Sequence, residues 1–307
     1  MTNSSNLIDS LEVYVLNNPD DVKPHWVSHF IVPTANELLI KIKNKNGNSG
    51  FGLATSYSDI SPIIKPFSNG LQDFIIGQDP FCPEKIYESI SKLTDTRISS
   101  EKGWSKEALI RISAALDIAC WDLIGKRLGK SVAELLGGNI TDEVITYHVV
   151  GITSPENAEE EAERLQVEGI SRIQLKAGGR AIENDIEAIK AVSGVLKRGT
   201  VLDVDTNRGW TEDEAIQVSN ACLEVSMSME QPCATEEELY RLKPKIFHPL
   251  IVDESATDIN TISKMVSSSI ADGFGLKITR IGGLTPMKAV RDFCVETQTP
   301  MSSDDAW

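Results

Sequence analysis

The sequence is 307 residues long, 41% hydrophobic, and has a formal net charge of −15 from 30 basic and 45 acidic side chains. That length allows about two domains with buried cores, while the acidic balance argues against nucleic acid or an anionic membrane as a partner. We find neither an apolar run of ~18 residues, as a membrane span needs, nor the basic and apolar segments of a signal peptide. Five scattered cysteines without a C-x-x-C pair indicate a reducing compartment, so we expect a cytoplasmic protein.

Residues 1–140 have the pattern of an α+β domain. Alternating apolar and polar residues predict antiparallel strands at 11–15 and 37–42, with Asn46-Gly47 as a hairpin turn. After residue 105, apolar residues recur every three or four positions and predict an amphipathic helix with one buried face. Those positions are Leu109, Ile112, Leu116, Ala119 and Leu123, and Trp121 on the same helix is expected in the core.

From residue 141 to 307, short apolar runs alternate with helical segments. Five of the runs end on a charged side chain, and successive ends are 23 to 29 residues apart; the five are Lys176, Asp205, Glu230, Asp253 and Lys277. That spacing suits a strand, a helix and two loops, and right-handed crossovers bring the strand ends to one face of the sheet. We therefore predict an α/β fold: a (β/α) TIM-type barrel with one site at its mouth, capped by the N-terminal α+β domain.

The predicted barrel lacks one unit. Seven strands can be placed, the first at 144–150 and the last at 300–303, whereas a closed barrel has eight. A missing eighth unit would leave two unpaired sheet edges. We expect either that the chain is a fragment, which we favour, or that another segment fills the gap.

Six short segments lie in the order and at the spacing of the long helix and the strand ends. They are AALDIACWDL at 114–123, QLK at 174–176, DTN at 205–207, EQP at 230–232, DES at 253–255 and LKI at 276–278. Together they resemble the mandelate racemase and muconate-lactonising branch of the enolase superfamily, from about residue 35 to the end. The resemblance implies a homo-oligomeric enzyme.

By this resemblance, Asp205, Glu230 and Asp253 would bind Mg²⁺. A hard divalent cation prefers oxygen ligands and keeps positions open for water and substrate. Asn207 and Glu254 would lie beside the metal and orient its ligands. The alternative is that each carboxylate caps a helix or pairs with a lysine.

The same resemblance implies that Lys176 and Lys277 are acid/base residues on opposite sides of the barrel mouth. The shared step of the family removes a proton next to a carboxylate, with a Lys or His base and Mg²⁺. A lysine acts as a base only in its neutral form, which burial and a nearby cation favour. The family usually has Lys-x-Lys on this strand, and Gln174 cannot supply positive charge to a substrate carboxylate. Alternatively, both lysines are structural ion-pair partners of the carboxylates.

The loop at 22–30 lies where the family has a lid over the barrel mouth, and it contains His25 and Trp26. Trp26 would either face a cationic amine of the substrate or pack between the domains. His148, on the first predicted barrel strand, is expected to be an interior histidine rather than a catalytic one.

The QLK segment, together with residues 230–235 and 302–307, is most similar to the subgroup of cis-3-hydroxyproline dehydratases and proline-betaine epimerases. We therefore expect Mg²⁺-dependent removal of the proton α to the carboxylate of a small substrate such as a proline derivative, giving racemisation, epimerisation or dehydration. Muconate cycloisomerase, dipeptide epimerase and sugar-acid dehydratase activities remain open. So do a catalytically inactive Mg²⁺-binding scaffold and a phosphate-binding barrel without metal.

Overall fold

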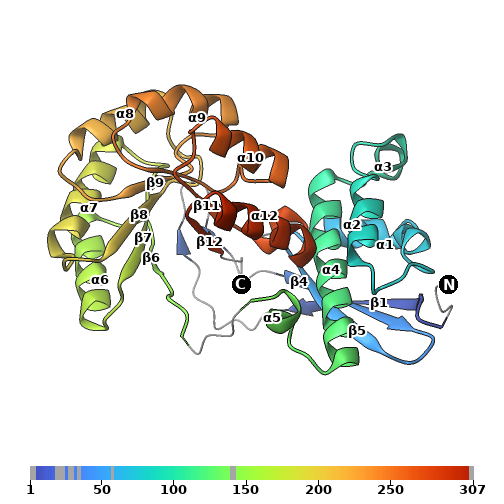
Figure 1. Ribbon diagram of the computed structural model, residues 1–307. Helices are drawn as coiled ribbons and strands as arrows, with labels where there is room; N and C mark the ends of the chain where they lie inside the picture. The colour runs from blue at the N-terminus through green and yellow to red at the C-terminus, as the bar shows by residue number, and fades with distance from the viewer. Residues whose placement is uncertain are drawn as a thin grey trace.

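The computed structural model describes residues 5–17, 25–26, 31–32, 36–56, 59–138 and 143–303, which form two halves (Figure 1). The N-terminal half contains an antiparallel sheet of order β1-β4-β5, with helices on one face, and a separate pair of short strands, β2 and β3. Its hairpin between β4 and β5 confirms the predicted turn. The strands are β1 (Ile8–Asn17), β2 (His25–Trp26), β3 (Ile31–Val32), β4 (Asn36–Asn44) and β5 (Ser49–Ser56).

The long helix α4 (Lys106–Leu128) is the centre of the N-terminal half. Ser105 caps its first turn, and Gly129 ends it in the left-handed region with φ +64°. The sheet approaches α4 so closely that a Cβ at Gly52 would lie 1.9 Å from the carbonyl oxygen of Ala115. The other helices of this half are α1 (Ser61–Ser68), η1 (Leu71–Phe74), α2 (Pro83–Ser91), α3 (Arg97–Lys102) and α5 (Val132–Leu135).

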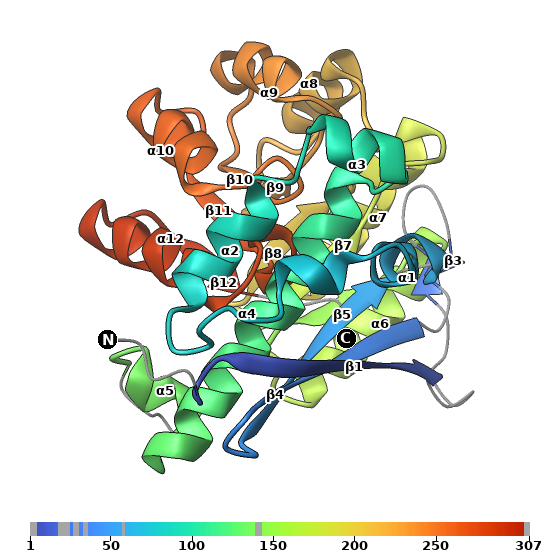
Figure 2. The same ribbon diagram turned by 90° about the vertical axis from the view of Figure 1, so that its right-hand side faces the viewer.

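The C-terminal half is a curled sheet of seven parallel strands in sequential order, with helices on its outer face (Figures 1 and 2). This arrangement confirms the predicted TIM-type α/β fold, with β6 and β12 at the sheet edges. The strands are β6 (His148–Val150), β7 (Arg172–Lys176), β8 (Val201–Asp205), β9 (Ser228–Glu230), β10 (Leu250–Val252), β11 (Gly273–Leu276) and β12 (Met301–Ser303). The helices are α6 (Pro155–Val167), α7 (Ile182–Val195), α8 (Glu212–Ala221), α9 (Glu236–Leu242), η2 (Lys243–Lys245), α10 (Ile259–Ser267), α11 (Ile278–Ile281) and α12 (Leu284–Glu296).

Alternation along the strands separates an apolar outer face from a polar inner face. On β7, Ile173 and Leu175 are buried in the cluster between sheet and helices. Lys176 bonds to a side chain of the adjacent strand β8, and Gln174 reaches across β8 to Glu230 of β9 on the inner face. A capping box of Thr211 and Glu214 begins α8. Burial of the apolar side chains against the helices fixes the orientation of each strand, and this orientation determines which polar side chains meet on the inner face.

Helix α4 is buried on two sides. Its five predicted apolar positions are fully buried, which confirms that face, but Ala114 and Asp117 on another side are buried too. There Asp117 contacts Gly283 and Thr285 at the start of α12, so the expectation of a single buried face is wrong. Trp121 is only partly buried, and its indole N–H donates to Thr285 Oγ1 at 2.9 Å. It lies at the contact between the halves rather than in a core.

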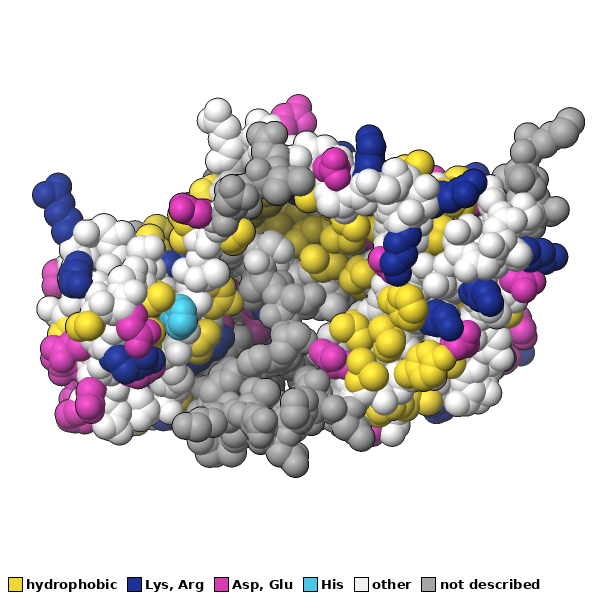
Figure 3. All heavy atoms as spheres, turned by 90° about the horizontal axis from the view of Figure 1, so that it is seen from below, with side chains coloured by type: hydrophobic (Ala, Val, Ile, Leu, Met, Phe, Trp, Pro, Cys, Tyr) yellow, Lys and Arg dark blue, Asp and Glu magenta, His cyan; other side chains and the backbone are white. Residues whose placement is uncertain are grey.

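His148 is exposed, and the expectation of an interior histidine is wrong. The reason is that β6 is an edge strand, paired in the described chain with β7 alone. Seen from below, the surface is hollowed between the halves, and hydrophobic side chains gather on the N-terminal half (Figure 3), where Tyr14, Phe51 and Leu53 of the sheet are exposed.

Each half has its own hydrophobic cluster, one within residues 8–123 and the other within residues 150–294. The proposed domain boundary near residue 140 falls on residues 139–142, outside the described part of the chain, and stays a prediction. Over the described ranges, we find no helix with the length and apolar character needed to cross a membrane.

The halves meet where Asp117 of α4 faces the turn between α11 and α12. Its Oδ2 accepts the backbone N–H of Thr285 at 2.9 Å, and a Cβ at Gly283 would lie 2.6 Å from the same oxygen. Within the described residues, Oδ1 has no hydrogen-bond partner. Burial raises the pKa of the Asp117 carboxyl from 3.8 to about 6, because the hydrogen bonds from Thr285 offset only part of the lost hydration.

We predict that this carboxyl makes the protein less stable as the pH rises. A carboxyl whose pKa is higher in the folded than in the unfolded chain stabilises the fold fully below pH 3.8, and that contribution is lost as the pH rises through about 6. The loss corresponds to about 3 kcal/mol. The free energy of unfolding of the parent, minus that of Asp117→Asn, should therefore fall by about 3 kcal/mol across this range in urea titrations. A difference that does not change with pH would contradict the assignment.

Candidate active site

All five predicted strand ends lie at the carboxyl-terminal end of the curled sheet, as the parallel registers require. Lys176, Asp205 and Glu230 are the last residues of β7, β8 and β9, and Asp253 and Lys277 directly follow β10 and β11. Four are buried, and the Lys277 side chain is 15% exposed. The structure therefore brings together the two lysines and three carboxylates singled out from the sequence.

The lysines and carboxylates are paired with one another. Lys176 Nζ lies 2.5 Å from Asp205 Oδ2, and Lys277 Nζ lies 2.9 Å from Asp253 Oδ2. Gln174 Nε2 donates to Glu230 Oε2 at 2.8 Å, so the amide is directed to this carboxylate. The ion pairs between lysines and carboxylates, which the sequence left open as an alternative, are therefore present in this structure.

Arg280 is a third cation of the site, and the sequence reasoning missed it. Its guanidinium donates to the carboxylate of Asp253 and, at 2.8 Å, to the Asp253 carbonyl oxygen. Arg280 lies on the single turn of α11, three residues after Lys277, which is the extended N-cap of that helix, and both side chains contact Asp253. That spacing was the signal available in the sequence.

Charge is unevenly distributed among the acidic residues. Burial, together with the neighbouring carboxylates of Asp205 and Asp253, raises the pKa of Glu230 well above its ordinary value. Burial also acts to raise the pKa of Asp253, but Lys277 and Arg280 outweigh it and leave that pKa lowered. The negative charge of Glu230 is thus less well compensated than that of Asp253.

Lys176 is held in its charged form. Burial disfavours the ammonium, but the contact with Asp205 outweighs burial and raises the Lys176 pKa above 10.5. As long as Asp205 pairs with it, Lys176 is an acid rather than a base.

Glu254 is a second acidic residue of the site with a raised pKa, and Arg208 Nε lies 3.8 Å from Glu254 Oε1. Burial, then the charges of Asp253 and Asp205, raise the Glu254 pKa to about 7. Its Oε1 accepts from Asn207 Nδ2 at 3.3 Å, and its buried Oε2 has no hydrogen-bond partner in the described chain. Asn207 Nδ2 also lies 3.0 Å from Asp205 Oδ2 and joins the two carboxylates.

These residues fit a hard divalent cation in their chemistry. Across the described residues, no three His, Cys, Asp or Glu side chains are grouped closely enough to hold a metal ion as they stand. However, the buried oxygen of Glu254 without a partner and the raised pKa of Glu230 both indicate carboxylates that a cation would stabilise. Asp205, Glu230 and Asp253 are the candidates to bind it.

Asp185 of α7 ties together the loops that follow β7 and β8. This fully buried carboxylate accepts the N–H of Gly178 at 2.8 Å, the indole N–H of Trp210 at 2.9 Å and Arg180 Nε at 2.6 Å. Gly178 is two residues beyond Lys176, and Trp210 is five beyond Asp205. Asp185 therefore holds in place the two loops that directly follow Lys176 and Asp205.

The predicted lid falls almost wholly outside the described residues. Only the backbone of His25 and Trp26 is placed, in β2. Their side chains, and residues 22–24 and 27–30, lie outside the described part, so the lid and both residue roles stay predictions.

Comparison with known proteins agrees with this architecture. Residues 10–137 match the family described as mandelate racemase / muconate lactonizing enzyme, N-terminal domain, and residues 157–306 match the enolase C-terminal domain-like family. The chain is 32% identical to cis-3-hydroxy-L-proline dehydratase of Roseibium aggregatum, over 92% of this chain and 75% of that protein. It is 24% identical to N-succinyl-L-Arg/Lys racemase of Bacillus cereus, over 91% of this chain and 74% of that protein. A crystal structure of an enolase-superfamily member from Roseovarius nubinhibens, complexed with magnesium, has a TM-score of 0.85 at 23% identity and covers 97% of this chain and 79% of that one.

A curled parallel sheet with charged residues at its strand ends, joined to an α+β half, defines a TIM-type enzyme. The chain belongs to the mandelate racemase / muconate lactonizing enzyme family of the enolase superfamily, as its sequence predicted. It is an isomerase or lyase of that superfamily.

We predict unequal roles for the two lysines in stability. Lys176→Met leaves the buried Asp205 without its cation and should lower the free energy of unfolding by about 3–5 kcal/mol. Lys277→Met is the matched control, because Arg280 still pairs with Asp253, and its loss should be smaller. Denaturant unfolding with a metal chelator present measures both, and equal losses would contradict the pairing.

Proposed function

We propose that this protein removes the proton α to a carboxylate of a small substrate, with Lys176 and Lys277 as the acid/base residues. The observation that carries the proposal is the convergence of two ammonium groups and three carboxylates from five successive strand ends in one largely buried site. Buried ionisable groups with shifted pKa values are typical of active sites.

In this proposal Asp205, Glu230 and Asp253 hold Mg²⁺. When bound, the ion supplies positive charge that stabilises the negative charge developing on the substrate carboxylate. The raised pKa values of Glu230 and Glu254, which come from burial and from neighbouring carboxylates, support this assignment. The assignment of Asp205 as a metal ligand also affects Lys176, because the ion pair with Asp205 keeps that lysine protonated. When Asp205 binds the ion instead of Lys176, the pKa of Lys176 falls and the lysine can accept a proton.

The substrate we propose is a proline derivative or a related small amino acid, supported by the 32% identity to cis-3-hydroxy-L-proline dehydratase. An epimerase would use both lysines, one on each face of the α-carbon. A dehydratase would use one lysine as base and an acid near the departing hydroxyl. Muconate cycloisomerisation, dipeptide epimerisation and sugar-acid dehydration are the alternatives of the same superfamily, and a homo-oligomer is the assembly we propose.

We predict that each lysine is needed for exchange of the substrate α-proton with solvent deuterium. Lys176→Ala and Lys277→Ala should each lower the exchange rate with at least one enantiomer by about 10²–10⁴-fold, because a positioned proton acceptor is lost. Proton NMR over a library of amino acids, proline derivatives, dipeptides and sugar acids measures the exchange and identifies the substrate. Lys288→Ala, on the surface of α12, is the control that should exchange as the parent does. Parental exchange by both lysine variants with both enantiomers would remove the assignment.

We predict that Mg²⁺ stabilises the parent but not Asp205→Asn. At 100 times the dissociation constant, a bound ion adds about 2.7 kcal/mol to the free energy of unfolding. Thermal unfolding with and without Mg²⁺ measures the shift. Asp203→Asn is the matched control, since Asp203 is a buried carboxylate on the same strand that pairs instead with Arg172 Nε at 2.7 Å. An Asp205→Asn variant stabilised by Mg²⁺ as strongly as the parent would argue against the ligand role.

A further inference from the structure

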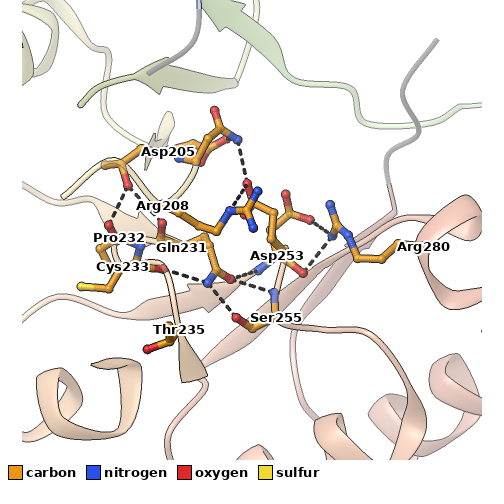
Figure 4. A network of polar contacts seen from close by, with 12 residues as sticks. Asp205, Arg208, Gln231, Pro232, Cys233, Thr235, Asp253, Ser255 and Arg280 are labelled. Carbon is orange, nitrogen blue, oxygen red and sulfur yellow. Dashed lines mark hydrogen bonds and ion pairs between the residues drawn. The ribbon is translucent and has the colours of Figure 1, made fainter. Parts of the chain in front are cut away.

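We infer that Gln231 is the positioning residue that fixes the three acidic strand ends relative to one another; this inference rests on the metal-binding role proposed above. Gln231 follows Glu230 directly, at the end of β9, and is fully buried. Figure 4 shows its side chain directed toward the chain at Asp253 and Ser255. It is not one of the charged residues of the site, and the motif that contains it gave it no role.

The side-chain amide of Gln231 uses every hydrogen-bonding position it has. Its Oε1 accepts the backbone N–H groups of Asp253 and Ser255, each at 3.1 Å. Its Nε2 donates to Ser255 Oγ at 2.8 Å and to the Cys233 carbonyl oxygen at 3.1 Å. A glutamate lacks the two donors and a leucine or methionine lacks both kinds of group, so glutamine is the side chain of this length that satisfies all four contacts.

The backbone of Gln231 joins the third strand end to the other two. Its carbonyl oxygen accepts Thr206 Oγ1 at 3.0 Å and the N–H of Arg208 at 2.8 Å, from the chain directly after Asp205. Its own N–H donates to the Ile251 carbonyl oxygen at 2.9 Å. Gln231 therefore connects all three strand ends. It directly follows Glu230, its side chain accepts the N–H of Asp253, and its backbone carbonyl holds the turn after Asp205.

Such an anchor is needed because the regular pairing of β9 with β10 stops before Asp253. The β9–β10 pairing ends at Glu230 and Ile251, and beyond it like charges favour separation of the strand ends. Gln231 adopts φ +37°, a conformation that non-glycine residues rarely take, and its hydrogen bonds hold it there. Loss of a residue that orients metal ligands typically weakens metal binding 10–100-fold.

The test is the dissociation constant for Mn²⁺, a hard-ion probe for the Mg²⁺ site, measured by electron paramagnetic resonance on the whole chain. Gln231→Leu should bind Mn²⁺ about 10–100-fold more weakly than the parent. Gln166→Leu is the matched control, since Gln166 is also buried and bonds to Ile170, Lys197 and Thr200 at the opposite ends of β7 and β8. It should lose thermal stability as Gln231→Leu does but keep the parental dissociation constant.

A folded Gln231→Leu protein with the parental dissociation constant would overturn the inference. If that variant does not fold, Thr206→Val and Ser255→Ala each remove a contact to Gln231, and each should weaken Mn²⁺ binding several-fold. Parental binding by both would likewise overturn it. Absence of binding by the parent, or parental binding by Asp205→Asn, would instead overturn the proposed metal site itself.

Discussion

Like-charge repulsion between carboxylates at neighbouring strand ends is the constraint on which this site depends. Adjacent strands lie only about 4.8 Å apart, so acidic residues at successive ends are necessarily near one another and away from bulk water. Lys176 and Lys277 come from the same row of strand ends and supply positive charge where it is needed. Glu230 lies between Asp205 and Asp253 in strand order, and its pKa is raised first by burial and then by the repulsion from these two carboxylates, which the lysines do not cancel.

The fold tolerates this concentration of charge because neutral groups hold the chain in place. Gln174 bonds to Glu230, and Asn207 bridges Asp205 and Glu254. Asn207 and Arg208 have positive φ angles of 46° and 68°, and such conformations in non-glycine residues cost about 1–3 kcal/mol each. The outer face compensates: side chains such as Leu175 and Val204 are buried against the helices. Apolar packing outside the sheet therefore supports a strained, polar arrangement inside it.

The sequence predicts the parts that follow from local pattern. Apolar runs that end in charge at nearly constant spacing located the strand ends of the barrel half, and a three-four spacing located α4. The remaining features depend on tertiary structure. The exposure of His148 depends on where the sheet ends, and the second buried side of α4 depends on which helices pack there. The pairing of Lys176 with Asp205 was left open because both charges are compatible with a metal site or an ion pair until the distance between them is known. Arg280 was missed because a one-turn helix leaves almost no periodic signal.

The two lysines are held by different means. Lys176 ends β7, a strand that is paired on both sides, and its supports, Asp205 and the loop held by Asp185, all lie within the C-terminal half. Lys277 instead begins the short helix α11, which contacts α4 of the N-terminal half. The following turn is held there by Asp117 and Thr285, in a space that only Gly283 fits. The N-terminal half is thus part of the framework of the active site. A substitution at the contact between the halves should displace Lys277 more than Lys176, because it is Lys277 that adjoins an element in contact with α4.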